Sequence, residues 1–173
     1  ISGCINGSVT DPKLGALTNN SAFGGELRIG GFIGYIEKYN VNVAGFKNYA
    51  PVTNNGASTG KTALGGVVGI IYNSSSLKLS GCENHGPVVN NASLANAYLG
   101  GIVGWLKTAK VNVDDVRNTA AVTNDGSVTK DCHVVAGGIV GCILTVLPLW
   151  IIVVASISSE VALTTYGYRL WPV

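Results

Sequence analysis

Short apolar runs separated by polar turns recur along this chain at a nearly constant interval. Several runs alternate apolar and polar residues, as in Val41-Asn42-Val43, Leu77-Lys78-Leu79 and Val111-Asn112-Val113. Strict alternation is typical of half-buried strands, and the Asn, Gly and Pro residues between the runs mark turns. The pattern therefore predicts an all-β chain with three or four short strands in each repeated unit.

A glycine motif sets the length of the repeat. It consists of Gly-Gly, two apolar residues and Gly, and its copies follow one another at intervals of 35, 35 and 37 residues. The copies span residues 30–34, 65–69, 100–104 and 137–141. A fixed period of this size predicts a stack of units, each of which buries its apolar face against its neighbours. The paired glycines indicate either a positive φ or a close approach of two backbones.

An asparagine motif occupies a second fixed place in each unit. Three residues after each alternating run lies an apolar position, and a repeated Asn follows it by two residues. These are Phe46, Cys82 and Val116 for the apolar position and Asn48, Asn84 and Asn118 for the Asn. A further Asn recurs at Asn54, Asn90 and Asn124. We interpret the repeated Asn as a left-handed turn residue or as a rung in a ladder of stacked amides, rather than as a ligand.

The first residues enter this repeat in the middle of a unit. Residues 1–4 match residues 43–46, Asn6 takes the place of the repeated Asn, and Val9 takes that of the repeated Val, one residue early. The chain has no Met, so we expect Ile1 to begin a processed form or a fragment. The predicted organisation is four units followed by a distinct terminal segment. The units are 1–34, 35–69, 70–104 and 105–141, and the terminal segment is 142–173.

The two motifs together resemble the GLUG-type repeats of surface proteins. The resemblance covers residues 1–141 and rests on the order Cys-x-Asn-x-Gly-x-Val followed by Gly-Gly-Ile-Val-Gly. It implies an extracellular β-solenoid that serves as a stalk, a spacer or an adhesive surface. The family motif contains no catalytic residue, so the resemblance implies none here.

The terminal segment has two interpretations. No charged residue lies between Val134 and Ser159, and an apolar run of this length is a candidate membrane span over 142–159. However, Ile152 to Ile157 also match Val41 to Phe46, which predicts a degenerate fifth rung. An apolar terminal rung predicts burial against another subunit and hence head-to-tail self-association. The candidates for that interface are Leu147, Leu149, Trp150, Ile151 and Ile152.

Charge and catalytic chemistry are both sparse. Only 12% of the residues are charged, against about 25% in a typical domain, and the net charge of +2 has no basic cluster behind it. We therefore expect no nucleic-acid partner. His85 and His133 occupy non-equivalent positions without an acidic pairing pattern, and the side chains of Asp114 and Asp115 would face opposite ways on a strand. The sequence thus predicts no enzyme, no cofactor and no metal site.

Sequons and cysteines supply the remaining candidate sites. N-glycosylation sequons begin at Asn6, Asn19, Asn73 and Asn91. The last three lie in loop-like stretches, whereas Asn6 is expected to be buried. Cys132 and Cys142 flank the last glycine motif and are the candidate disulfide. Cys4 and Cys82 lie two units apart, too far to bond.

We thus predict a secreted or cell-surface β-solenoid, structural or adhesive, that forms a fibre or surface array. One alternative is a membrane-anchored surface antigen or adhesin. Another is a glycan-binding or carbohydrate-active β-helix module, which needs aromatic or acidic side chains aligned across the units. The position after each glycine motif holds Tyr35, Ile70, Trp105 and Cys142, so only two of the four are aromatic.

Overall fold

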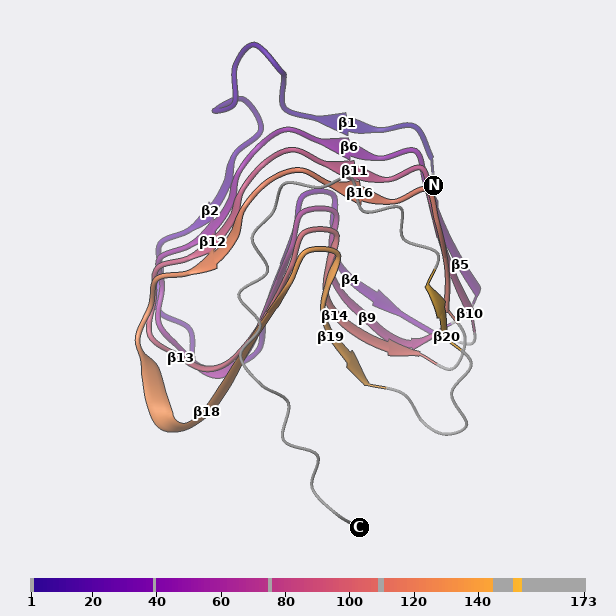
Figure 1. Cartoon of the computed structure of the whole chain (residues 1–173). Helices are drawn as coiled ribbons and strands as arrows, with labels where there is room; N and C mark the ends of the chain where they lie inside the picture. Colours follow the sequence, from indigo (N-terminus) through magenta and orange to yellow (C-terminus); the bar gives the residue numbers. More distant parts are fainter. Residues whose placement is uncertain (1, 39, 75, 109–110, 145–150, 154–173) are drawn as a thin grey trace.

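The chain coils into a β-solenoid whose strands all pair in parallel with the coils before and after them (Figure 1). The computed structural model describes residues 2–38, 40–74, 76–108, 111–144 and 151–153. Within these ranges it contains strands and turns but no helix, so none of them holds a helix that could cross a membrane. The all-β repeat solenoid predicted from the sequence is confirmed.

Each coil contributes one strand to each of five sheets, and each sheet holds four strands. The first sheet contains β1 (Ile5–Asn6), β6 (Lys47–Asn48), β11 (Glu83–Asn84) and β16 (Arg117–Asn118). The second contains β2 (Leu17–Asn19), β7 (Val52–Asn54), β12 (Val88–Asn90) and β17 (Val122–Asn124). The third contains β3 (Leu27–Gly30), β8 (Ser58–Gly65), β13 (Leu94–Gly100) and β18 (Val128–Gly137).

The remaining two sheets close the coil. The fourth contains β4 (Ile33–Glu37), β9 (Val68–Ser74), β14 (Val103–Thr108) and β19 (Val140–Leu144). The fifth contains β5 (Asn40–Ala44), β10 (Ser76–Ser80), β15 (Val111–Asp114) and β20 (Ile151–Val153). The prediction of three or four strands per unit was therefore too low. The polar residues that precede the second glycine motif belong to a strand, because they form the first half of β8. There, Ser58 and Thr62 are buried, and exposed residues lie between them.

The glycine motif turns the chain back at the middle of the coil. Residues 31–32, 66–67 and 101–102 join the third sheet to the fourth, and Figure 1 shows these turns beneath the β6–β11–β16 sheet. We call each of them the inward bend. The backbones are close there: a Cβ added to Gly66 would lie 2.2 Å from the carbonyl oxygen of Gly101. Close approach, and not a positive φ, explains the paired glycines.

The inward bend divides the interior into two apolar cores. One core lies between the second and third sheets and includes Val52, Leu64 and Leu99. The other lies between the fourth and fifth sheets and includes Phe46 and Ile71. All five of these side chains are fully buried or nearly so. Apolar burial on both sides of the bend holds each coil on its neighbours.

Two ladders of asparagine side chains run along the solenoid. Asn6, Asn48, Asn84 and Asn118 form the first, and Asn19, Asn54, Asn90 and Asn124 form the second. At every step the amide nitrogen of one Asn donates to the side-chain oxygen of the next, over 2.7–3.0 Å. Each amide nitrogen that continues a ladder also donates to a backbone carbonyl in its own coil, so both of its hydrogens are used. The repeated Asn is therefore a ladder residue and not a left-handed turn residue.

The first asparagine ladder packs against the glycines of the inward bend. A Cβ on Gly66 would lie 2.3 Å from Cγ of Asn84, and one on Gly101 would lie 2.4 Å from Cγ of Asn118. The two sequence motifs thus meet between neighbouring coils, where the glycine motif of one coil contacts the repeated Asn of the next. Only a residue without a side chain leaves room for the amide.

The first coil differs from its predicted alignment. Residues Ser2, Ile5 and Asn6 pair as the sequence predicts, with Ala44, Lys47 and Asn48. However, Leu17 pairs with Val52, whereas Val9 is 76% exposed. The placement of Val9 in the repeat was therefore wrong. Residues 8–16, which contain Pro12 and Gly15, form an inserted loop between β1 and β2, at the top of Figure 1.

The terminal segment begins with two strands. Cys142, Ile143 and Leu144 belong to β19, and β20 pairs with β15. Val111 lies opposite Ile151, one residue earlier than the sequence alignment predicts. Ile152 lies in the same strand, while Leu147, Leu149 and Trp150 lie outside the described residues, as does most of the candidate membrane span. The described parts of 142–159 are strand, and the choice between a fifth rung and a membrane span stays a prediction.

Candidate functional site: an aromatic and basic groove

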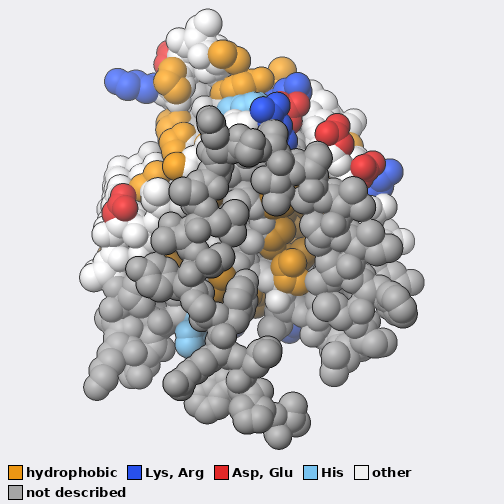
Figure 2. Space-filling view, viewed as in Figure 1, with side chains coloured by type: hydrophobic (Ala, Val, Ile, Leu, Met, Phe, Trp, Pro, Cys, Tyr) orange, Lys and Arg blue, Asp and Glu red, His pale blue; other side chains and the backbone are white. Residues whose placement is uncertain are grey.

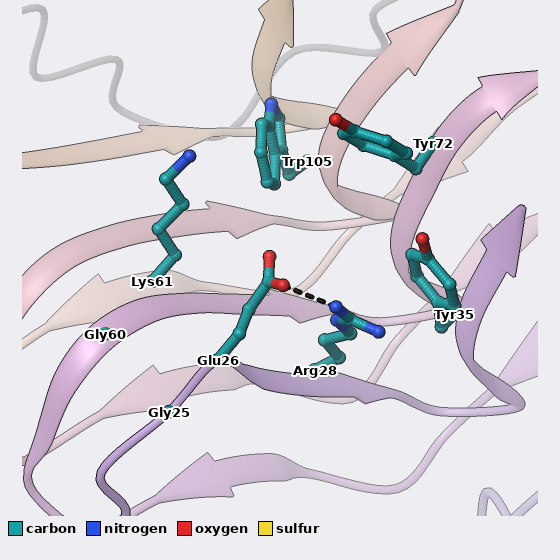
Figure 3. A pocket seen from close by; sticks show the side chains of 8 residues that line it. All are labelled: Gly25, Glu26, Arg28, Tyr35, Gly60, Lys61, Tyr72 and Trp105. Carbon is teal, nitrogen blue, oxygen red and sulfur yellow. Dashed lines mark hydrogen bonds and ion pairs between the residues drawn. The ribbon is translucent and has the colours of Figure 1, made fainter.

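A groove follows the outer side of the inward bend. It lies between the third and fourth sheets, which leave the bend as two diverging arms. Its volume is about 500 Å³, within the range of about 300–1,000 Å³ that is usual for small-molecule sites. Figure 3 shows the side chains of Glu26, Arg28, Lys61, Tyr72 and Trp105 directed toward one space, with Tyr35 beside them. We call this feature the aromatic groove.

Aromatic rings from three coils form the groove wall. Tyr35 on β4 and Trp105 on β14 lie at equivalent positions, with Ile70 between them in register. Tyr72 meets the edge of Trp105 at a centroid distance of 5.9 Å, and Tyr98 stacks on it at 5.3 Å. Trp105 is only 6% exposed, whereas the three tyrosines are half-buried. The exposed ring surface of the groove therefore belongs to the tyrosines.

Three cations lie against these rings. The Arg28 guanidinium stands 3.9 Å from the centroid of Tyr35, and Lys61 Nζ stands 4.7 Å from that of Trp105. Lys107 Nζ lies 4.6 Å from the centroid of Tyr72 and donates to its hydroxyl at 3.2 Å. Arg28 also pairs with Glu26. Among the described residues neither Lys61 nor Lys107 forms an ion pair, so the groove retains positive charge.

Burial in the groove keeps its acidic hydroxyl and thiol groups neutral. Desolvation raises the pKa of Tyr98 and that of the Cys142 thiol above their usual values. It also raises the pKa of Tyr35, to which the Glu37 carboxylate adds by repulsion of the phenolate. The hydroxyls of Tyr35 and Tyr98 are therefore hydrogen-bond donors and acceptors at neutral pH.

Sequence reasoning identified part of this groove. The position that follows each glycine motif does face it, as Tyr35 and Trp105 show. Tyr72 and Tyr98 were missed because they occupy two other repeat positions, on β9 and β13. Only the inward bend brings these positions together. Two strands that diverge from a bend turn their outer faces toward each other. The sequence does not show where the chain bends, so it could not show that these two faces form one groove.

A second polar cluster lies on the first sheet, on the outer side of the solenoid. Glu83 accepts from Lys47 at 2.9 Å and contacts His85 Nε2 at 2.8 Å. The His85 ring stacks on Tyr49 at a centroid distance of 4.9 Å, and its Nδ1 lies 2.7 Å from the Thr119 hydroxyl. The prediction that His85 has no acidic partner was thus wrong. Residues two apart on an extended chain share a face, which brings Glu83 to it. Figure 2 shows acidic, basic and histidine side chains gathered over this sheet.

This cluster makes stability depend on acid pH. Hydrogen bonds from Lys47 and His85 hold the pKa of Glu83 below its usual value. A depressed carboxyl pKa stabilises the fold above the unfolded-state pKa of about 4.3, and this stabilisation is lost as pH falls through the folded value. We expect the melting temperature of the wild type to fall more steeply below pH 5 than that of Glu83→Gln. The effect is small, because the groups are partly solvated. The melting temperatures of both proteins are measured from pH 7 to pH 3. An equal decrease in wild type and Glu83→Gln would contradict the stabilising role of Glu83.

The four sequons lie in different environments. Asn73 is exposed, but it lies inside β9 and not in a loop as predicted; it is the extra residue where the pairing with β14 shifts register, with φ of 53°. Asn91 is exposed, and its amide donates to Asn55 in an outer row of asparagines. Asn6 and Asn19 belong to the two interior ladders. The expectation that Asn19 lies in a loop was wrong, because Leu17-Thr18-Asn19 is the strand that pairs with Val52-Thr53-Asn54.

The cysteines and the remaining candidates add no further site. Cys4, Cys82 and Cys142 are free, and Cys82 is buried at the repeated apolar position. Because Cys142 is free, the predicted disulfide between Cys132 and Cys142 is not formed in this structure. Asp114 and Asp115 are exposed, and His133 uses its backbone amide to bind Asn96. Among the described residues no three His, Cys, Asp or Glu side chains converge as metal ligands.

Comparison with known proteins gives no relative. No protein-family model, curated protein or solved structure matches the chain. The resemblance to GLUG-type repeats therefore stays a prediction from the sequence.

Proposed function

We propose that this chain is a structural and adhesive repeat module of a secreted or cell-surface protein, without catalytic activity of its own. One observation supports it above the others: both asparagine ladders continue through four successive coils. The residues that repeat are therefore those that stack one coil on the next. A repeat protein built in this way is a stiff rod whose length grows with the number of its coils.

The apolar segment 142–159 is the proposed contact for assembly. Its sequence is uncharged, and its strand β20 continues the fifth sheet. In this proposal the segment packs against a second copy and produces a head-to-tail array, since such a contact does not close on itself. The interface residues would include Leu147, Leu149, Trp150 and Ile152.

Light scattering after gel filtration and negative-stain microscopy of the full chain test this assembly. We expect filaments or large assemblies for the wild type and loss of them in the Trp150→Glu, Ile152→Lys double variant. Val9→Lys is the matched control, because Val9 is also apolar and is 76% exposed, but lies in the inserted loop. A wild-type chain that stays monomeric at high concentration would refute the assembly.

The sequons give a test of the extracellular assignment. When the chain is expressed through a eukaryotic secretory pathway, we expect a glycan on Asn73 and none on Asn19 in the folded product. Asn19 uses both amide hydrogens, toward Asn54 Oδ1 at 2.8 Å and the Ser21 carbonyl at 2.9 Å, and a glycan leaves only one. Peptide mass spectrometry locates the glycans, with Asn73→Gln as control. Secreted, folded protein with a glycan on Asn19, or failure of the chain to be secreted, would contradict this account.

A further inference from the structure

The side chains of the aromatic groove combine half-buried aromatic rings with two cations that lack carboxylate partners among the described residues. Tyr35 and Tyr72 supply half-buried rings, and Lys61 and Lys107 supply the unpaired charges. Neither kind of residue recurs in every coil, so the stacking of the coils does not depend on it, although the position of Tyr35 is aromatic again at Trp105. Position 35, for example, becomes Ile70 in the next coil, and position 72 becomes Lys107. The aromatic and basic side chains of the groove are thus not required for the stacking of the coils.

We propose that the aromatic groove binds an acidic oligosaccharide, with sugar rings against Tyr35 and Tyr72 and a carboxylate or sulfate held by Lys61. This deepens the adhesive part of the proposed function and rests on it. It concerns the ligand alone and leaves the rod-like assembly untouched if it fails.

The backbone of the groove walls favours a sugar over a peptide. The inner strands of the groove walls pair with the coils on both sides, as β8 does with β3 and β13 and β9 does with β4 and β14. Their N–H and C=O groups are therefore engaged, and an extended peptide could add as a further strand only at the free edges of the two sheets, such as those of β3 and β4. A ligand against the inner strands must be recognised by side chains. The half-buried rings of Tyr35 and Tyr72 offer an apolar contact to a sugar ring, whose own face is also apolar.

The charges select an acidic ligand. Lys61 lines the groove and Lys107 lies against the ring of Tyr72, whereas Arg28 and Glu26 pair with each other. Lys61 Nζ projects over the ring of Trp105, as Figure 3 shows. An anionic group entering the groove would gain a charge-assisted hydrogen bond from Lys61. A neutral sugar would have the ring contacts alone.

The test is calorimetric titration of the full chain at 0.15 M salt with tetragalacturonate, a uronic-acid oligosaccharide. The neutral tetramer of galactose and a tetraglutamate peptide are titrated in parallel. We expect measurable binding of tetragalacturonate, and binding at least about tenfold weaker for each of the other two. The Lys61→Gln and Tyr35→Ala variants should each lose at least about tenfold in affinity, a change of about 1.4 kcal/mol in binding free energy.

Lys78→Gln is the matched control, because it removes the same charge from an exposed position on β10, away from the groove. It should bind as the wild type does, and melting curves establish that each variant is folded. Equal losses in Lys61→Gln and Lys78→Gln would show diffuse attraction and overturn the proposal. So would equal binding of the neutral sugar or of the peptide, or absence of binding at millimolar concentration. Filaments that persist without any sugar binding would refute the ligand and leave the structural function standing.

Discussion

Replacement of Asn84 by Leu is expected to destabilise the protein by about 3 kcal/mol or more, since each buried polar group left without a partner costs about 1–3 kcal/mol. Asn84 is fully buried. Its oxygen accepts from Asn48 at 2.8 Å, and its nitrogen donates to the Gly86 carbonyl and to Asn118, also at 2.8 Å. Leucine removes all three bonds at once. Urea unfolding followed by circular dichroism measures the loss.

The Asn84→Asp variant separates the effect of losing the hydrogen bonds from the effect of changing the shape of the side chain. Aspartate has nearly the same shape, but its second oxygen would face the Gly86 carbonyl and the oxygen of Asn118, where the amide donates. Burial disfavours the charged carboxylate, so the folded-state pKa should rise. The destabilisation should then grow as pH rises above the unfolded value of about 3.9. We expect a larger stability deficit at pH 7 than at pH 4.

Asn55→Ala is the matched control for the ladder. Asn55 also belongs to a row of bonded asparagines, between Asn20 and Asn91, but it is exposed to solvent. Water replaces its partners, so we expect a change within about 0.5 kcal/mol. Equal effects at Asn55 and Asn84 would mean that the buried ladder contributes nothing special to the stacking of the coils.

Replacement of Gly66 by Ala is expected to cost about 3 kcal/mol or more, at the upper end of overpacking effects, which are commonly about 1–3 kcal/mol. A Cβ there would lie 2.2 Å from the Gly101 carbonyl oxygen and 2.3 Å from Cγ of Asn84. Asn84 is held by three hydrogen bonds, and Gly101 is backbone whose own N–H donates to the Gly137 carbonyl, so neither neighbour can move aside easily. The bend can relax only by separating two coils.

Gly24→Ala is the control for this substitution. Gly24 is exposed, has no positive φ, and a Cβ there would meet nothing within 4 Å. Alanine at this position should leave the free energy of unfolding within about 0.5 kcal/mol of the wild type. If Gly66→Ala were equally neutral in thermal and urea unfolding, the inward bend could not pack against the ladder as described.

The repeat register was predictable because the same residue types return at the same spacing. Val41, Leu77 and Val111 were aligned from the sequence, and they lie opposite one another in the fifth sheet. The buried position at Phe46, Cys82 and Val116 was identified for the same reason. Periodicity fixes which residues stack, since a stack of equal coils places each residue on its equivalent.

The path of the chain within one coil was not predictable in this way. Repetition says nothing about where a coil folds inward, so the groove and two of its aromatic side chains, Tyr72 and Tyr98, were missed. The first coil failed for another reason. Its inserted loop offers Val9 close to the expected spacing, whereas Leu17 lies eight residues later but brings the complete Leu-Thr-Asn strand. For the alignment of the first coil, the single apolar residue Val9 was weaker evidence than Asn19, which completes the second ladder.

Hydrogen exchange of asparagine side-chain amides by nuclear magnetic resonance tests the account most directly. The amides of Asn48, Asn54, Asn84 and Asn90 are fully buried, and both of their hydrogens are bonded. We predict that they exchange only when the whole solenoid unfolds, with protection close to that of the most stable backbone amides. The exposed amides of Asn55 and Asn91 should exchange orders of magnitude faster. Equally fast exchange at Asn84 and Asn55 would contradict the ladder and, with it, the stacking of these coils.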